Sequence, residues 1–259
     1  MRDYGRIRVT RDGVVETITL AYPERRNAIG PRMTNELLWA LDDARSAPEV
    51  RSIVLTGDGK SFCSGGDFAE MTSGVVESKL PPRGDYSDLL LALAKTDKPV
   101  VARVNGHAMG GGLGLVAAST FAVASSEAKL GTPEIDVGLF PMMIMAVLAR
   151  LVHKRRLLEM MIFGEKLDAA EAMRVGLVNR VAQPDALDAE VKKITDAIAG
   201  KSPSTVRLGL RAFAAQEDVD LERALPLLRE RLAECLATED AREGLTAFLE
   251  KRAPKWTGR

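Results

Sequence analysis

Two glycine-rich segments constrain this sequence more than any other feature. Ser64-Gly65-Gly66-Asp67 and Gly110-Gly111-Gly112 each follow a run of β-branched and apolar residues that is typical of a buried strand. Glycine has no Cβ, so the main chain can approach a ligand closely, and free N–H groups at a helix start can hold negative charge. Because such loops gather outside the carboxyl ends of parallel strands, we expect both segments to face one site.

A carboxyl group follows the second segment in Pro133-Glu134. One N–H from each glycine segment could hold a carbonyl oxygen in an oxyanion hole, where each donor contributes about 3 kcal/mol of transition-state stabilisation. A nearby carboxyl can then move a proton to or from the carbon beside that charge. The pattern predicts enolate chemistry on an activated carbonyl compound.

Composition narrows the class of protein. With 259 residues, of which 46% are hydrophobic, the chain can bury one large core or a main core with a smaller appendage, and the second is favoured. Lys plus Arg and Asp plus Glu both number 36, so the formal charge is zero and no basic block indicates a nucleic-acid or membrane partner. The first residues lack the apolar segment of a secretion signal, and no apolar run reaches membrane-spanning length, so a cytoplasmic protein is expected.

The cysteines and one histidine suggest alternatives to the glutamate. Cys63 and Cys235 lie far apart without metal-ligand spacing, which predicts reduced thiols and no metal site. Cys63 could be a reactive thiol beside the first glycine segment, but a small buried residue is favoured. His107 could be a general base, although without a companion carboxylate a structural role is favoured.

Hydrophobic periodicity predicts a mixed α/β core. Asp12-Gly13 between two β-branched runs indicates a hairpin. Parallel strands joined by helical crossovers should follow, and the aperiodic stretch 72–88 is expected to be a mobile lid or loop. Strands are expected at 7–10, 14–20, 52–55, 99–104, 121–124 and 176–181, and helices at 31–47, 89–94 and 113–118.

After Ala182 the pattern becomes helical. The apolar stripe in 221–236 is expected to be a packing surface rather than a cofactor site, and it could equally bury against another subunit. Helices are expected at 185–199, 203–215, 221–236 and 240–250.

Several of these segments, in this order and spacing, resemble the enoyl-CoA hydratase/isomerase, or crotonase, superfamily. The resemblance spans nearly the whole chain. Its motifs are Arg26-Asn27-Ala28, Ser64-Gly65-Gly66-Asp67, 98–112, Gly131-Thr132-Pro133-Glu134, 172–178 and 243–248.

The resemblance implies a fold, an assembly and a substrate. The expected fold is α/β, a crotonase-like ββα spiral core over 1–199, followed by a helical region over 200–259 for trimerisation and covering of the active site. Homotrimers or homohexamers, an acyl-CoA thioester substrate and a place in fatty acid metabolism are implied. No cofactor is implied beyond the CoA moiety of the substrate.

The resemblance also implies residue roles. The N–H groups of Gly66 and Gly111 would hold the thioester carbonyl, with Glu134 as the catalytic acid and base. At the C-terminal end, Phe248 and Lys251 match positions that hold the nucleotide end of CoA, often across a subunit boundary, although Lys251 could equally be a solvated charge. The path for the rest of CoA would be lined, largely through the backbone, by Arg26, Asn27, Ala28, Ser64, Gly65 and Asp67.

One departure from the family pattern bears on the reaction. Hydratases of this family place two glutamates around a water, and the first of these positions falls on Gly114 here. One carboxyl suffices for a 1,3-proton shuttle, so double-bond isomerisation of an enoyl-CoA is expected. A hydratase with an atypical site and a non-catalytic acyl-CoA-binding member are the alternatives. Gly114 could also serve close packing or add pocket volume.

Three smaller points stay open in the sequence. In Phe140-Pro141-Met142-Met143, relatives commonly carry glycines after the proline, and the bulkier methionines here either reshape the acyl pocket or fill the core, of which core filling is favoured. The apolar segment 139–145 should bury Glu134 and raise its pKa, and Asp136 would share its face if the backbone were extended. Residues 112–117 fit the dinucleotide pattern G-x-G-x-x-A but begin well beyond their strand, which disfavours a nucleotide-binding module.

Overall fold

The N-terminal half forms the strand framework expected from the sequence. The computed structural model describes residues 2–73 and 78–259. Strands β1 (Ile7–Asp12) and β2 (Val15–Leu20) form an antiparallel hairpin with Asp12 opposite Val15, so the Asp12-Gly13 turn is confirmed. From β2 onward the larger sheet is parallel, through β3 (Ser52–Gly57), β5 (Val100–Val104), β7 (Phe121–Ser125) and β10 (Arg180–Ala182).

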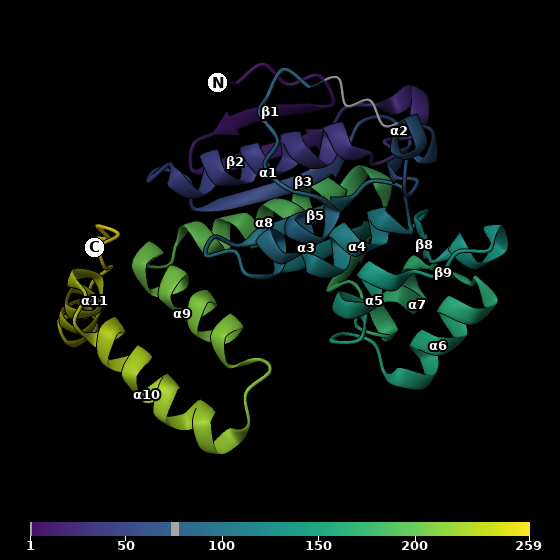
Figure 1. The fold of residues 1–259 in the computed structure, drawn as a ribbon. Helices are drawn as coiled ribbons and strands as arrows, with labels where there is room; N and C mark the ends of the chain where they lie inside the picture. Colours follow the sequence, from purple (N-terminus) through teal and green to yellow (C-terminus); the bar gives the residue numbers. More distant parts are fainter. Residues whose placement is uncertain (1, 74–77) are drawn as a thin grey trace.

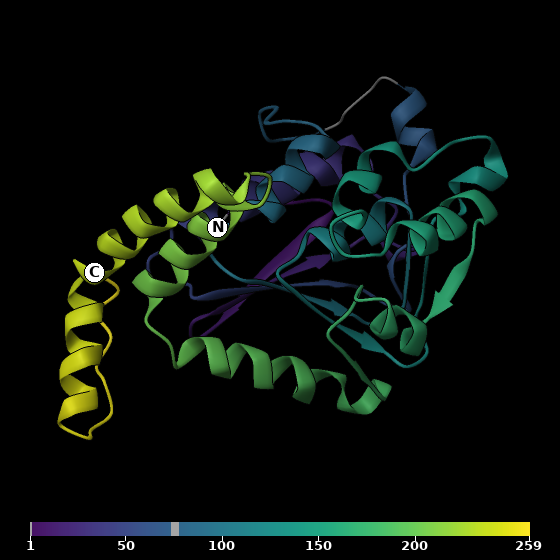
Figure 2. The ribbon, with the colours of Figure 1, turned by 90° about the horizontal axis from the view of Figure 1, so that it is seen from below.

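The larger sheet is buried on both faces because successive side chains of a strand alternate. In β3, Ile53 and Leu55 belong to the main core, whereas Val54 belongs to a second cluster with Leu187 and Val191. Figure 2 shows α8 (Leu187–Ala199) along one face of the sheet. The opposite face carries α1 (Pro31–Ser46), α3 (Tyr86–Ala94) and α4 (Gly111–Ala118).

A second, smaller sheet was not predicted. Three-residue strands carry too little periodicity to be recognised in a sequence. The chain passes from β3 to β4 and from β5 to β6, so each glycine-rich segment follows a strand of the smaller sheet, and β5, β6 and α4 form one ββα unit. This sheet has the order β4 (Ser61–Cys63), β6 (His107–Met109), β8 (Lys129–Gly131) and β9 (Lys166–Asp168).

Short helices complete the part of the molecule around the smaller sheet (Figure 1). The 3₁₀ segments η1 (Pro23–Arg25) and η2 (Pro133–Val137) precede glycine-rich or apolar loops, and η3 (Pro184–Ala186) leads into α8. The remaining helices of this part are α2 (Phe68–Ser73), α5 (Met142–Leu148), α6 (Lys154–Phe163) and α7 (Ala169–Arg174).

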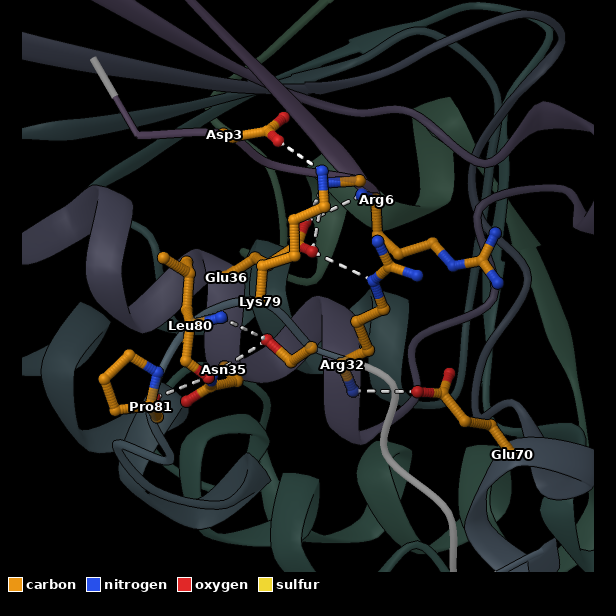
Figure 3. Close-up of polar contacts among 11 residues, drawn as sticks. Asp3, Arg6, Arg32, Asn35, Glu36, Glu70, Lys79, Leu80 and Pro81 are labelled. Carbon is orange, nitrogen blue, oxygen red and sulfur yellow. Dashed lines mark hydrogen bonds and ion pairs between the residues drawn. The ribbon is translucent and has the colours of Figure 1, made fainter.

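The stretch expected to be a mobile lid is mostly ordered against α1. Its first residues belong to α2, its last three belong to α3, and 74–77 lie outside the described residues. Asn35 donates to the carbonyl oxygen of Pro81 at 3.0 Å and accepts from Arg83 N at 2.7 Å, as Figure 3 shows for Pro81. Trp39 Nε1 also donates to that carbonyl at 2.9 Å. Residues 78–85 are therefore an anchored loop.

A second expectation was also wrong in part. The strand expected at 176–181 is only the three residues of β10, because Gly176 to Asn179 turn out of α7. Asn179 holds this turn to β7: its N–H donates to the carbonyl oxygen of Ala122, and its side chain accepts from Ala122 N, both at 2.8 Å.

Helices close to those expected form the C-terminal part. In Figures 1 and 2, α9 (Pro203–Gln216), α10 (Leu221–Leu236) and α11 (Glu239–Leu249) extend away from the two sheets. Arg211 of α9 donates to buried Asp97 at 2.5 Å, which ties this helix to the core. Within the described residues, no helix combines the length and apolar character needed to cross a membrane. The division of the chain at 199/200 stays a prediction.

Candidate active site

A cavity of about 420 Å³ opens where the glycine-rich segments meet the η2–α5 segment. Gly66, Gly111 and Glu134 all line it, so the structure brings together the three residues on which the enolate hypothesis depends. The rest of the lining is mostly apolar and comes from α1, α2, α3 and α5 and from the residues that directly precede α1, α3 and α5: Ile29, Gly30, Pro31, Thr34, Phe68, Met71, Gly84, Asp85, Tyr86, Leu139, Phe140, Pro141, Met142, Met143 and Ile144.

Backbone hydrogen bonds join the first glycine segment to the turn that precedes α1. Ser64 N donates to the carbonyl oxygen of Arg26 at 3.0 Å, and Ile29 N donates to that of Gly65 at 2.8 Å. Asp67 N then donates to the Ile29 carbonyl oxygen at 2.9 Å. Among the described residues, no acceptor receives the N–H of Gly66, which lies in the middle of this pairing. A donor is thus presented to the cavity.

The turn of Arg26, Asn27 and Ala28 supports this loop from behind. The buried Asn27 side chain accepts from Tyr22 N and donates to the carbonyl oxygens of Asp58 and Ser61, all at 2.9 Å. Six residues that are expected along the CoA path belong to this turn and to the first glycine segment and do not line the cavity. Their contact with CoA stays a prediction. They are Arg26, Asn27, Ala28, Ser64, Gly65 and Asp67.

The second glycine segment begins α4. Gly110 has φ 48° and donates to the carbonyl oxygen of Gly131 at 2.9 Å. Gly111 is the first residue of the helix, where a backbone N–H has no partner within the helix, and no acceptor for it exists among the described residues. A Cβ at Gly112 would lie 2.6 Å from Cys63 Cβ, so this glycine permits close packing. The G-x-G-x-x-A match is therefore part of a packed helix.

Glu134 faces Gly110 across the cavity wall. Thr132, whose hydroxyl donates to the Met160 carbonyl oxygen at 2.9 Å, precedes the η2 segment that carries Glu134. A Cβ at Gly110 would lie 2.6 Å from Glu134 Oε1, and Oε2 is buried without a hydrogen-bond partner among the described residues. Burial raises the pKa of Glu134, which confirms the expected direction. The carboxyl is free to accept and return a proton.

Other candidate groups lie outside the cavity. Asp136 lies within η2 but outside the cavity lining, and a Cβ at Gly164 would lie 3.1 Å from its Oδ1, so it does not stand beside Glu134 as a second acid. His107 is exposed, and its Nδ1 accepts from Lys129 N at 3.1 Å, as a structural residue would. Across residues 2–73 and 78–259, no three His, Cys, Asp or Glu side chains gather to hold a metal ion.

Cys63 is a packing residue. Its side chain is fully buried beside Gly112, and burial raises the pKa of its thiol to about 12. A neutral thiol that solvent does not reach is a poor nucleophile. The interpretation of Cys63 as a small buried residue is confirmed.

The methionines after Pro141 face the cavity. Met142 is 65% exposed and Met143 is 48% exposed, whereas Ile144 and Leu148 of the same helix are buried. Together with Phe140 they line the wall near Glu134. The favoured core-filling interpretation was therefore wrong for Met142 and Met143, whereas Phe140 is half-buried and also packs against the main core.

Tyr86 was missed because its segment was read as a loop. It is the first residue of α3, and its hydroxyl donates to the Gly111 carbonyl oxygen at 2.5 Å. Burial raises its pKa well above the ordinary value, with smaller contributions from Cys63 and Glu134, so the phenol is neutral. A signal did exist: Asp85-Tyr86-Ser87-Asp88 has the spacing of a helix-capping box.

Gly114 lies beneath Tyr86. A Cβ at Gly114 would lie 2.4 Å from Tyr86 Oη and 2.5 Å from Ile144 Cγ2. Close packing therefore accounts for this glycine, and it adds no volume to the cavity.

Phe248 and Lys251 are remote from the cavity within one chain. Phe248 is 81% exposed at the end of α11, which Figure 1 places on the opposite side of the molecule from α2 and α5. Their contact with CoA, across a subunit boundary, stays a prediction.

Comparisons with known proteins identify the family and support the fold. A family model described as enoyl-CoA hydratase/isomerase matches residues 10–259. The chain is 34% identical to a crotonyl-CoA hydratase of Syntrophomonas wolfei, over 96% of each chain. Its fold is similar to an enoyl-CoA hydratase of Mycobacterium smegmatis (TM-score 0.89, 34% identity, 97% of this chain and 99% of that one). It is also similar to that of Bacillus anthracis (TM-score 0.90, 30% identity, 98% and 100%).

Proposed function

Because this chain belongs to the enoyl-CoA hydratase/isomerase family and is a crotonase-superfamily enzyme, we propose that it moves the double bond of an enoyl-CoA thioester. The single observation that carries this proposal is the cavity shared by Gly66, Gly111 and Glu134. Two unpaired N–H groups and one unpartnered carboxyl oxygen are the parts that an enolate mechanism needs.

The proposed reaction is a proton shuttle within one acyl chain. Glu134 removes a proton from C2 of a 3-enoyl-CoA, the C2–H electrons move to the thioester oxygen, and the N–H groups of Gly66 and Gly111 hold the dienolate. The protonated Glu134 then gives its proton to C4, while a double bond forms between C2 and C3. Atoms and charge balance without any cofactor beyond the CoA moiety of the substrate.

The single carboxyl favours isomerisation over hydration. Asp85 also reaches the cavity, but its Oδ1 accepts from the N–H groups of Ser87 and Asp88 at 2.8 and 3.1 Å as the cap of α3. A second glutamate at Gly114 would require Tyr86 and Ile144 to move, because a Cβ there would lie 2.4 Å from Tyr86 Oη and 2.5 Å from Ile144 Cγ2. Hydration needs a group that positions a water, in addition to the group that moves the proton.

The apolar side chains of the cavity wall favour an apolar acyl group as the substrate. Met71, Met142 and Met143 have flexible, polarisable side chains that adapt to irregular shapes, and Phe68 and Phe140 add aromatic surface. An assembled homotrimer or homohexamer would cover the exposed apolar residues of α10 and α11, and a cytoplasmic place in fatty acid metabolism is part of the same proposal.

Hydration by an atypical site is the second candidate because several relatives, including the Clostridium acetobutylicum short-chain-enoyl-CoA hydratase at 32% identity, are named as hydratases. A non-catalytic acyl-CoA binder is the third. One assay separates isomerisation, hydration and binding without catalysis. The enzyme is incubated with 2-hexenoyl-CoA or 3-hexenoyl-CoA in deuterated water, and the masses of the products are measured by mass spectrometry.

Isomerisation predicts a product to which no water has been added, and this product carries deuterium at C2 or C4 to the extent that the proton on Glu134 exchanges with the solvent before it is returned. A product heavier by one water would overturn it in favour of hydration, and binding without turnover would support the non-catalytic alternative. Glu134→Gln should lower turnover by about 100- to 10,000-fold, the usual contribution of general acid–base catalysis. Asp136→Asn is the matched control, since Asp136 is a nearby carboxyl outside the cavity.

A further inference from the structure

Tyr86 is held in one place by the start of α3. Asp85 Oδ1 accepts from Ser87 N at 2.8 Å and from Asp88 N at 3.1 Å, while Asp88 Oδ2 accepts from Asp85 N at 2.9 Å. This reciprocal capping box fixes the backbone on both sides of Tyr86. The phenol is thereby aimed into the cavity from a rigid helix end.

The Tyr86 hydroxyl contacts one half of the proposed oxyanion hole. It donates to the Gly111 carbonyl oxygen at 2.5 Å, and a Cβ at Gly111 would lie 3.5 Å from both Cζ and Oη of Tyr86. Gly111 is the first residue of α4, so its carbonyl belongs to the same helical turn as its unpaired N–H. A hydrogen bond to that turn restrains where the N–H points.

The same hydroxyl closes the space above Gly114. A Cβ at Gly114 would lie 2.4 Å from Tyr86 Oη, and its third-nearest neighbour, Ile144 Cβ, would be 3.2 Å away. No ring carbon of Tyr86 would therefore lie closer than 3.2 Å to a Cβ at Gly114. The hydroxyl oxygen, rather than the ring, is the atom of Tyr86 that excludes a side chain.

We propose that Tyr86 is a positioning residue that holds Gly111 for the thioester oxygen and, by occupying the space over Gly114, keeps the site to the single carboxyl of Glu134. This inference rests on the proposed function, because it assigns the role of Gly111 in that reaction. Tyr86 acts through Gly111 and transfers no proton. Both half-reactions, C2 deprotonation and C4 protonation, pass through the dienolate that Gly111 holds, so both depend on Tyr86.

Tyr86→Phe tests the positioning role because it removes only the hydroxyl. Exchange of the C2 proton for deuterium reports the first half-reaction, and isomerisation of 3-hexenoyl-CoA reports the complete one. Both kcat values should fall together, by about tenfold, while KM changes less than threefold. Tyr4→Phe, the same substitution at the N-terminal end of the chain, is the control and should change neither.

Two outcomes would overturn the positioning role. Unchanged rates would show that the hydrogen bond to Gly111 does nothing for the reaction. Loss of isomerisation with C2 exchange retained would make Tyr86 the proton donor to C4. If the unaltered enzyme exchanges no C2 proton and binds 3-hexenoyl-CoA without turnover, the proposed function fails instead, and the positioning role falls with it.

The exclusion of a side chain at Gly114 is tested without any activity. Gly114→Ala is made alone and together with Tyr86→Phe, and the Tm of each variant is compared with that of its parent. Because the nearest atom is Oη, the loss of Tm should be clearly smaller in the Tyr86→Phe background. Equal losses in both backgrounds would show that Ile144 alone excludes the side chain.

Discussion

At the scale of single residues, the burial that suits Glu134 for catalysis should also cost stability. Burial raises its pKa above the ordinary 4.5, so the folded protein binds this proton more tightly than the unfolded chain does. The loss in the free energy of unfolding is absent below pH 4.5, the ordinary pKa. It grows as the pH rises toward the higher pKa of the folded state. Each unit of elevation costs about 1.4 kcal/mol.

Glu134→Gln should therefore raise the Tm at neutral pH while it lowers turnover. The gain in Tm should vanish near pH 4, where the native carboxyl is protonated in both states. Thermal unfolding of both proteins at several pH values measures this. A gain that does not depend on pH would mean that ionisation of Glu134 is not its cause.

Gly110→Ala should lower kcat sharply, because its Cβ would lie 2.6 Å from Glu134 Oε1 and displace the carboxyl. The residue also has φ 48° and ψ −120°, a conformation that residues with a Cβ rarely adopt, so the substitution strains the backbone by about 1–3 kcal/mol. Gly13→Ala is the matched control, since Gly13 has φ 55° but nothing within 4 Å of a Cβ. Both variants should lose Tm, and only Gly110→Ala should lose kcat. An equal loss of kcat in both would exclude displacement of Glu134 as the cause.

The site could be predicted from the sequence to a different depth for different residues. Gly66, Gly111 and Glu134 carried a signal because two glycine-rich segments each follow a strand-like run and an acid follows the second of them. Tyr86 carried none of that kind, since an aromatic residue after a proline-rich stretch looks like any loop residue. Its importance comes from contact with Gly111 and Gly114, which only the folded chain brings near.

At the scale of elements, α2 forms a wall of the cavity through Phe68 and Met71. Glu70 of the same helix accepts from Arg32 N, at the start of α1, at 2.9 Å (Figure 3). A carboxylate is favourable at a helix N-terminus because it pairs with an N–H that has no partner within the helix. One side chain thus attaches this wall to the core.

Glu70→Ala should loosen α2 and raise KM for the acyl-CoA several-fold, with a smaller effect on kcat. We expect KM rather than kcat to change because Glu70 does not contact Gly66, Gly111 or Glu134, the residues proposed to act in the reaction. Loss of binding that is equal for the substrate and the transition state raises KM alone. Glu24→Ala in η1, an acidic residue that does not line the cavity, is the control. Steady-state kinetics with 3-hexenoyl-CoA check this. A fall in kcat at constant KM would contradict it.

Long elements were predictable and short ones were not. The helices α1 and α8 to α11 run long enough to repeat their hydrophobic period, as do all strands of the larger sheet except the three-residue β10. The strands of the smaller sheet have three residues each, and pairing between distant segments defines them. The 3₁₀ turn at η2 also escaped prediction, and it is this turn that points Asp136 away from Glu134.

At the scale of the whole molecule, buried Asp240 holds the chain terminus against α11 and α9. It accepts from Ser202 Oγ at 2.7 Å, Ser204 Oγ at 2.9 Å and Thr257 N at 2.7 Å. Burial alone would raise the pKa of Asp240, but these hydrogen bonds outweigh it and lower the pKa to about 2. The stabilisation is complete above the ordinary value of 3.8 and is lost as the pH falls through about 2.

Asp240→Asn should release residues 257–259 and lower the Tm at neutral pH, with the loss shrinking toward pH 2. Asn keeps the shape but accepts fewer and weaker hydrogen bonds. Hydrogen exchange at the amides of Thr257 and Gly258 reports the release directly. Exchange as slow as in the parent protein would contradict the assigned role.

Exposed apolar residues on the C-terminal helices predict an assembled protein. Leu221 and Leu225 share one side of α10 and remain exposed in the single chain. Leu225→Glu should shift the mass in solution from a trimer or hexamer toward the monomer, as measured by light scattering. Glu230→Lys, on the opposite side of the same helix, should leave the mass unchanged. A monomeric parent protein would contradict the prediction.

The pairing of Ile29 with Gly66 has a consequence for how the protein acquires activity. The two proposed oxyanion-hole donors, Gly66 and Gly111, come from segments that only the completed sheets bring together. A nascent or partly refolded chain would therefore have no site for a thioester. Recovery of turnover after dilution from denaturant should therefore be among the last signals to return. Acyl-CoA, which should bind only the finished form, should protect the enzyme from heat, and the protection should grow with the logarithm of its concentration once that exceeds the Kd.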